Sequence, residues 1–185
     1  MNKLAIALSA ALSLGAAASA SASVGTINFV GQVAADTCSV DIGGGGATTS
    51  ITLTPITAQA LKADAEAGSQ RFHVVLKAGT GSDAPKCDGD VTNLIVRKDG
   101  ITGAGHIGNA HTATPEKPAS NVVVQLYRKD GANETAVNLQ TDTLRAVKVD
   151  DSFDYEFVAR YLVPGGGDAT GGSYTGTLMF DVVNQ

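Results

Sequence analysis

The sequence lacks the features of several large functional classes. It has no Trp, its aromatic residues make up 5% of 185 residues, and 18 acidic residues outnumber 13 basic ones. A nucleic-acid binder needs a basic face or aromatic side chains on which bases can stack. The composition therefore excludes that class. Hydrophobic residues, at 43%, are numerous enough to form the core of one ordinary domain, so the chain is not a disordered polyelectrolyte.

Long hydrophobic runs are missing after the first twenty-odd residues, and the early run has the pattern of an export signal. Lys3 supplies a positive charge, and Leu4 to Ala18 is uncharged and largely apolar. This run is shorter than the roughly 20 residues that span a bilayer, and Ala20-Ser21-Ala22 forms an A-x-A cleavage site. We predict a signal peptide over residues 1–22 and a mature chain from Ser23. Cleavage after Ala18 or Ala20 and an uncleaved anchor are the alternatives.

Cysteine is scarce, with only Cys38 and Cys87 present. A redox-active pair more often has C-x-x-C spacing, and a zinc site needs further thiols or His nearby. In an exported protein a lone pair favours a structural disulfide. Closing a loop of about 50 residues contributes about 4 kcal/mol in the chain-entropy model.

Glycine is abundant, at 22 residues, and short segments with alternating apolar residues predominate. This pattern is typical of strands joined by Gly-rich turns and predicts a β-sandwich of seven to nine strands. The expected strands cover residues 24–33, 38–42, 50–56, 71–77, 91–97, 121–127, 153–162 and 174–182. The only helical pattern, Thr57 to Ala67, is brief, and Gly100 to Ser120 is expected to be a long surface loop.

No catalytic or metal-binding motif is apparent. His73, His106 and His111 lack the H-E-x-x-H spacing, and no G-x-S-x-G sequence is present. The Gly43–Gly46 run lacks the Lys-Ser/Thr that follows a phosphate-binding loop, so we interpret it as a turn. The spacing of three acidic residues does not fit an EF-hand loop. These residues are Asp150, Asp151 and Asp154. We expect no cofactor, no metal and no enzyme activity.

The two ends of the mature chain carry the most information. The alternating segment from Gly25 to Val33 begins almost at the mature N-terminus, ahead of the first cysteine. Such a strand either pairs within its own sheet or leaves its domain to pair with another subunit. A sheet with an unfilled edge is a strong acceptor, because its unpaired backbone groups and apolar groove both gain from an added strand.

Three stretches of the chain form a specific combination. Residues 25–40 have the pattern G-x-hydrophobic-x-F-x-G-x-V, followed within a few residues by Cys. The segment Phe157-Val158-Ala159-Arg160-Tyr161 contains A-R-Y, and Gly172 is the fourteenth residue from the C-terminus, with alternating apolar residues after it. Together these stretches resemble the pilin subunits of chaperone–usher fimbriae of the type 1 kind, a family that has each of the three features.

The resemblance implies an incomplete immunoglobulin-like β-sandwich that lacks its last strand and is completed by a donor strand from a neighbouring subunit. It implies an N-terminal extension over residues 23–33 and a pilin domain over residues 34–185. The donor face would be Gly25, Ile27, Phe29, Gly31 and Val33. The edge that accepts a donor strand or a chaperone would be Gly172, Tyr174, Leu178, Phe180 and Val182.

The implied partners are identical or related pilin subunits in a head-to-tail polymer, a periplasmic chaperone and an outer-membrane usher. The implied location is a fimbria on the bacterial surface. The chain departs from the family at its penultimate position, where Asn184 stands instead of an aromatic residue. The alternative is a minor adaptor or an adhesive subunit that binds a host glycan. An N-terminal extension followed by one domain favours a shaft or adaptor subunit.

Overall fold

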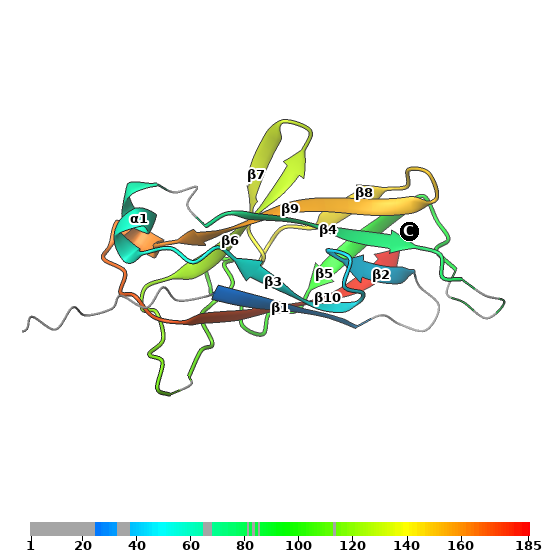
Figure 1. Cartoon of the computed structure of the whole chain (residues 1–185). Helices are drawn as coiled ribbons and strands as arrows, with labels where there is room; N and C mark the ends of the chain where they lie inside the picture. The colour runs from blue at the N-terminus through cyan, green and yellow to red at the C-terminus, as the bar shows by residue number, and fades with distance from the viewer. Residues whose placement is uncertain are drawn as a thin grey trace, which may run out of the picture.

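Two five-stranded sheets pack face to face in the computed structural model, which describes residues 25–32, 38–64, 68–80, 82, 84, 86–112 and 114–185 (Figure 1). For residues 25–32 the description covers the backbone. The alternation of apolar and polar residues is the reason for this architecture, since each strand buries one face and exposes the other. The predicted all-β sandwich is confirmed.

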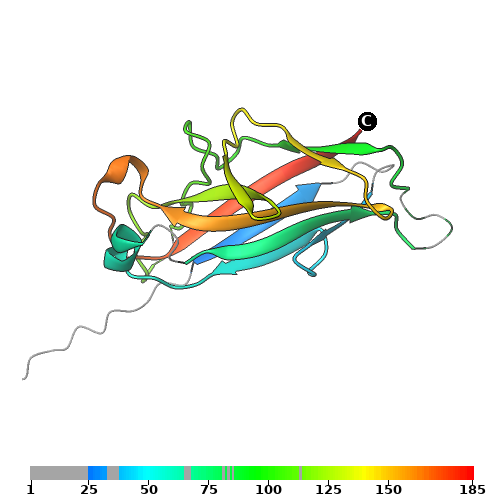
Figure 2. The same ribbon diagram turned by 90° about the horizontal axis from the view of Figure 1, so that it is seen from above.

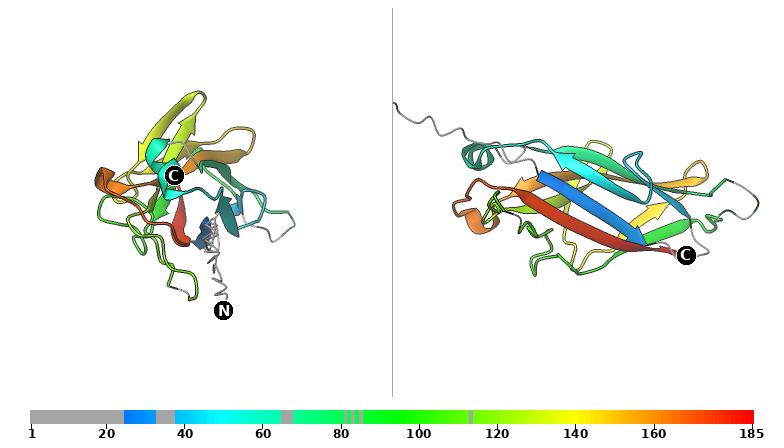
Figure 3. Two further views of the ribbon diagram at one scale, coloured as in Figure 1. Left: turned by 60° about the vertical axis from the view of Figure 1, so that its left-hand side comes forward. Right: turned by 60° about the horizontal axis from the view of Figure 1, so that its bottom comes forward.

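The first sheet contains the two ends of the described chain. Its strand order is β3 (Thr48–Leu53), β1 (Gly25–Gln32), β10 (Tyr174–Asn184), β5 (Val91–Val96) and β8 (Leu144–Val147). All neighbouring strands are antiparallel except β1 and β10, which are parallel. Figure 3 shows β1 and β10 lying side by side along most of the length of the molecule.

The second sheet forms the opposite layer of the sandwich. Its order is β2 (Ser39–Ile42), β4 (Gln70–Lys77), β9 (Ser152–Leu162), β6 (Val123–Asp130) and β7 (Asn133–Val137), and all its pairs are antiparallel. Seen from above, β9 and β4 run lengthwise, roughly along the direction of β1 and β10 (Figure 2). The two sheets are therefore in the aligned rather than the orthogonal arrangement.

The core lies between the sheets and is made from alternate residues of both. In β9, Phe153, Tyr155 and Phe157 are buried, and the ring centroid of Phe157 lies 5.6 Å from that of Phe72 in β4. The Tyr155 hydroxyl donates to the backbone oxygen of Thr92 in β5, 2.8 Å away. Because a buried hydroxyl without a partner is costly, this bond favours one alignment of the sheets.

The predicted helix is shorter than expected. It is α1 (Ala58–Ala63), which begins after Thr57, whose Oγ1 accepts a hydrogen bond from Ala60 N at 3.0 Å. This N-cap satisfies one backbone donor of the first turn. Leu61 is the residue of α1 that is buried, so the segment is a connector that closes one end of the sandwich.

The chain between β5 and β9 has two features that the sequence did not reveal. The segment Gly100–Ser120 is not purely a surface loop, because Ile107 is fully buried and forms bridges to Ile101 and Val124. Strands β7 and β8 were missed. Alternation of apolar residues could not reveal β7, since four of its five residues are exposed, and β8 has only four residues.

Candidate functional site

Strand β10 presents the apolar face that the sequence predicted as an acceptor edge. Its burial alternates along its length, and the inward residues Tyr174, Leu178, Phe180 and Val182 are each exposed by 5% or less. The intervening residues Thr175, Thr177, Met179 and Asp181 are only partly buried. This alternation follows from the period of two in a strand, so one whole side of β10 belongs to the core.

The backbone of β1 occupies the place beside this face. It pairs with β10 from Gly25 opposite Tyr174 to Gln32 opposite Asp181, and with β3 from Gly25 opposite Leu53 to Val30 opposite Thr48. In sheet order, β1 separates β3 from β10. The leading strand of this chain therefore fills an interior position of its own sheet.

The register aligns the predicted donor residues with the buried side of β10. Ile27 is opposite Gly176, Phe29 is opposite Leu178, and Gly31 is opposite Phe180. All three β10 partners are buried. Val33 lies outside the described residues. The structure thus brings the two predicted sets together within one chain, and the transfer of this strand between subunits stays a prediction.

Gly176 belongs to the site, although the sequence reasoning missed it. A Cβ atom at this position would lie 2.6 Å from the Tyr174 hydroxyl oxygen and 2.7 Å from Ile107 Cγ2. Only a residue without a side chain fits there. The signal was present in the sequence, because position 176 continues the alternation from Tyr174 to Leu178. Ile107 was missed because it lies in a Gly-rich segment that has no periodic pattern.

Gly172 has a physical role that explains why a glycine stands before β10. A Cβ atom here would lie 2.5 Å from both Ala119 N and the Pro118 carbonyl carbon. The adjacent Ser173 donates its backbone N–H to Lys117 O at 2.8 Å and accepts from Ala119 N at 2.8 Å. The absence of a side chain therefore lets the loop 117–119 pack against the start of β10.

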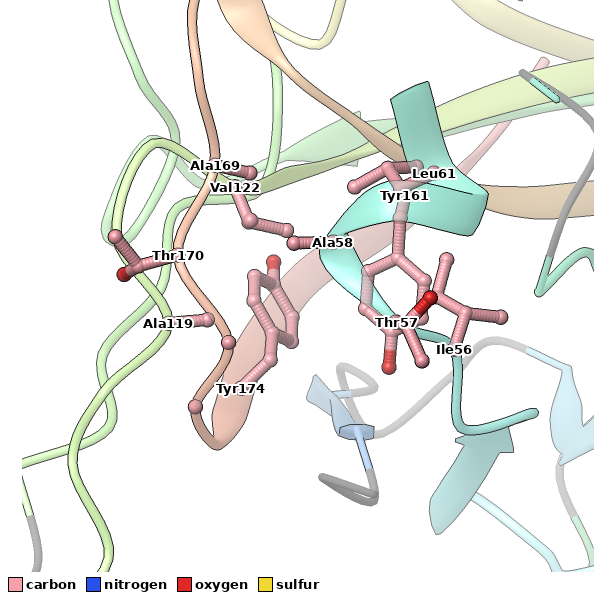
Figure 4. A pocket seen from close by; sticks show the side chains of 12 residues that line it. Ile56, Thr57, Ala58, Leu61, Ala119, Val122, Tyr161, Ala169, Thr170 and Tyr174 are labelled. Carbon is pink, nitrogen blue, oxygen red and sulfur yellow. The ribbon is translucent and has the colours of Figure 1, made fainter. Parts of the chain in front are cut away.

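A small hollow of about 40 Å³ lies at this end of the sandwich, beside the first residue of β10 (Figure 4). Its walls include Ile56, Leu61, Ala119 and the rings of Tyr161 and Tyr174, whose centroids are 5.7 Å apart in an edge-to-face arrangement. The Tyr174 hydroxyl donates to Ile107 O at 2.8 Å. Burial, with a further contribution from Tyr161, raises the pKa of Tyr174 far above its ordinary value, so its phenol stays neutral.

An ion pair and the disulfide lie near the far end of β10. Arg97 donates to both carboxylate oxygens of Asp181, at 3.1 and 2.7 Å, and this hydrogen bonding holds the pKa of Asp181 below its ordinary value. The predicted disulfide is formed between the buried Cys38 and Cys87. Asn184, the residue that departs from the pilin pattern, has its Oδ1 3.8 Å from Cys38 Sγ.

The other polar candidates do not form a catalytic arrangement in the described part of the chain. His73 Nδ1 lies 2.9 Å from Asp154 Oδ1 on the exposed face of the second sheet. Asp150 and Asp151 are exposed turn residues with positive φ. Over the described ranges, no group of three or more His, Cys, Asp or Glu side chains could hold a metal ion. No helix in those ranges is long and apolar enough to cross a membrane.

A scan against family models found no match, and a search of curated proteins found none. The structure is similar to an antigen and type I fimbria protein of Burkholderia pseudomallei, with 21% identity and a TM-score of 0.41, over 81% of this chain and 90% of that chain. It is also similar to the CupB6 tip adhesin of Pseudomonas aeruginosa, with 8% identity and a TM-score of 0.39, over 85% of this chain and 41% of that chain.

These structural neighbours are of the kind that the sequence resemblance predicted. Because both TM-scores lie below 0.5, the likeness by itself assigns neither fold nor function. The chain also spans only about two fifths of the tip adhesin's length. The functional assignment therefore depends on the leading strand and on the face that receives it.

Proposed function

We propose that this protein is a structural subunit of a bacterial surface fimbria that polymerises by donor-strand exchange. Residues 23–33 are the donor extension, and residues 34–185 form the body that receives the extension of another subunit. A periplasmic chaperone delivers the subunit to an outer-membrane usher. The observation that supports this proposal best is that the leading strand β1 lies between β3 and β10 as an interior strand.

Removing β1 from this position leaves a site that strongly favours a replacement strand. Both β3 and β10 lose the backbone pairing that β1 supplies. The buried side chains along β10, and Leu53 in β3, lie on the two strands that flank the vacated position. Unpaired strand edges beside an apolar face are the requirement for strand addition. Burying Ile27 and Phe29 in such a site contributes roughly 1.5–3 kcal/mol for each.

The direction of β1 is constrained by its own chain, whereas the direction of a strand from a second copy is not. β1 runs parallel to β10, and only residues 33–37 separate it from Cys38, the residue before β2. A strand from another molecule is free of this connection and enters antiparallel, the direction with the slightly more stable hydrogen bonding. With Phe29 kept opposite Leu178, this direction aligns Val33 with Tyr174 and Gly25 with Val182.

That antiparallel register matches five donor positions to the five inward positions of β10. The donor residues would be Gly25, Ile27, Phe29, Gly31 and Val33. The acceptor residues would be Val182, Phe180, Leu178, Gly176 and Tyr174, in the same order, and all five are buried. A better-packed antiparallel pairing would drive the exchange of the chain's own strand for that of a neighbour without nucleotide hydrolysis.

Electron microscopy of cells that produce this subunit with its chaperone and usher tests the proposal. The wild-type chain should form fibres, and a chain without residues 24–33 should be exported but form none. Fibres composed mainly of this chain identify a shaft subunit, whereas isolated copies in fibres of another chain identify an adaptor. Unchanged fibres after the deletion would contradict the donor assignment.

A further inference from the structure

Gly172 is the one residue of the expected acceptor edge that has no donor residue in the antiparallel register described above. That register ends with Val33 opposite Tyr174, the first residue of β10. Ser173 directs both its N–H and its C=O to the loop 117–119. Successive residues of an extended chain direct these groups to opposite sides, so those of Gly172 point to the side on which a donor strand lies. Among the described residues, none hydrogen-bonds to the N–H or the C=O of Gly172.

The hollow at the start of β10 lies where a longer donor strand would pass. Leu53 of β3 and Tyr174 of β10 are at one level, since both are opposite Gly25. Beyond that level the chain after β3 continues through Ile56 and the chain before β10 comes from Gly172, and both residues line the hollow (Figure 4). A strand held between β3 and β10 that continues for two more residues is therefore placed over the hollow.

The hollow suits a small apolar group. A cavity of about 150 Å³ holds benzene and one of about 10–15 Å³ holds a water molecule. The volume of the hollow, about 40 Å³, therefore fits a group of the size of a methyl. None of the residues that line it is charged, and a charged occupant without a partner would be costly. The smallest side chains of the lining belong to Ala58, Ala119 and Ala169.

We propose that Ala35 of the donor strand occupies this hollow and pairs with Gly172, as a sixth position of the strand exchange. The inference rests on the proposed function, because it extends the same register by two residues. Position 35 continues the alternation of positions 25 to 33, and its side chain is the methyl group that the hollow fits. The preceding Ala34 is on the opposite face of the strand. The donated strand thus extends to residue 35.

The hollow of one molecule cannot be filled by Ala35 of the same chain while β1 is in place. Gln32 is opposite Asp181, seven residues along β10 from Tyr174. Seven residues of a strand span about 23 Å, whereas the three residues from Gln32 to Ala35 span at most about 11 Å. A second copy of the chain is therefore the source of the occupant.

The sixth position shortens the connection between consecutive subunits. Only residues 36 and 37 then remain before Cys38, which is fully buried and bonded to Cys87. The three steps from residue 35 to Cys38 span at most about 11 Å. The disulfide end of one subunit is therefore held close to the α1 end of the next, which limits bending between the two.

Synthetic peptides added to the mature, disulfide-bonded protein test the proposal without fibres. A peptide of residues 24–37 should dissociate at least about tenfold more slowly than a peptide of residues 24–33, because it adds a buried methyl group and backbone bonds to Gly172. In the longer peptide, Ala35→Asp should abolish this gain and Ala34→Asp should preserve it, since only the former places a charge in the hollow.

Each outcome of the peptide measurement decides the proposal. Equal dissociation of the two peptides, or equal effects of the two substitutions, would overturn the sixth position and leave the exchange of residues 25–33 standing. If neither peptide binds, the strand exchange itself fails, and the sixth position fails with it.

Cysteine pairs in assembled fibres provide a second measurement. Ala58 lines the hollow, whereas Ala63, at the other end of α1, does not. Ala35→Cys combined with Ala58→Cys should form covalent ladders under mild oxidation at least about tenfold faster than Ala34→Cys combined with Ala58→Cys, because side chains alternate between faces. Ala35→Cys combined with Ala63→Cys should also be slow. Equal rates in fibres that form normally would overturn the sixth position alone, whereas an absence of wild-type fibres would contradict the proposed function.

Discussion

Ile27 of β1 lies opposite Gly176 of β10 in the parallel register of the two strands. The space that a side chain at position 176 would occupy is taken by the Tyr174 hydroxyl and by Ile107 Cγ2. The start of the acceptor face is therefore already filled by residues of the body. At Gly176 a donor strand therefore packs against a surface that Tyr174 and Ile107 have already filled. Because Gly176 has no side chain, the backbone of the donor strand can approach closely.

Substitution of Gly176 tests this packing. Gly176→Val should lower the free energy of unfolding by about 1–3 kcal/mol, because the added methyl groups overpack the contact with Tyr174 and Ile107. Urea unfolding of the mature protein measures the change. The control is Gly103→Ala, where no atom lies within 4 Å of the added Cβ. Equal effects of the two substitutions would contradict the assignment.

Gly172 should be equally intolerant, for a different reason. Its neighbours are backbone atoms of residues 117–119, which cannot rotate away as a side chain can. Gly172→Ala should therefore displace this loop and cost about 1–3 kcal/mol, whereas Gly171→Ala, with no atom within 4 Å, should cost little. Urea midpoints give the difference, and hydrogen exchange at Ala119 N shows whether the loop has moved.

The face assignment of the donor strand is tested by two neighbouring residues. Phe29→Asp should reduce the rate of fibre assembly more than about tenfold, because it places a charge where an apolar side chain is expected to be buried. Asn28→Asp adds the same charge on the opposite face and should have a much smaller effect. Assembly is followed by light scattering and electron microscopy. Equal inhibition would show that the faces are assigned the wrong way round.

The disulfide should contribute strongly to stability. Replacing both Cys38 and Cys87 with Ala should lower the free energy of unfolding by about 4 kcal/mol, the value for freeing a loop of about 50 residues. Urea unfolding measures this loss. A reducing agent should destabilise the wild-type protein in the same direction and have no effect on the double variant. A loss below about 1 kcal/mol would mean that the bond adds little to the native packing.

The ion pair at the far end of β10 predicts a dependence on pH. The pKa of Asp181 is lowered in the folded protein by hydrogen bonding to Arg97, so its stabilising contribution is present above the ordinary value of 3.8 and is lost as the pH falls further. Asp181→Asn should flatten the acid side of the stability profile, and Arg97→Gln should have the same effect. If the loss in the double variant equals the sum of the two single losses, the two residues act independently.

The strand pattern and its faces could be predicted from the sequence, because alternation is a local property. The inward residues of β10, from Tyr174 to Val182, were predicted as one face and are one face. The two cysteines and the short connector helix were also recognised. Ile107 and strand β7 could not be predicted in this way, since one is buried by distant strands and the other is stabilised by pairing with β6.

By itself, the sequence determined that this is a β protein with one cysteine pair, an alternating segment near each end and no recognisable catalytic motif. Only the tertiary structure decided that the leading strand lies between β3 and β10, that it runs parallel to β10, and that Gly172 and Gly176 are closed in by neighbours. The physical reason is that side-chain alternation repeats every two residues along one strand. Strand partners, direction and close approach depend instead on residues far apart in the chain.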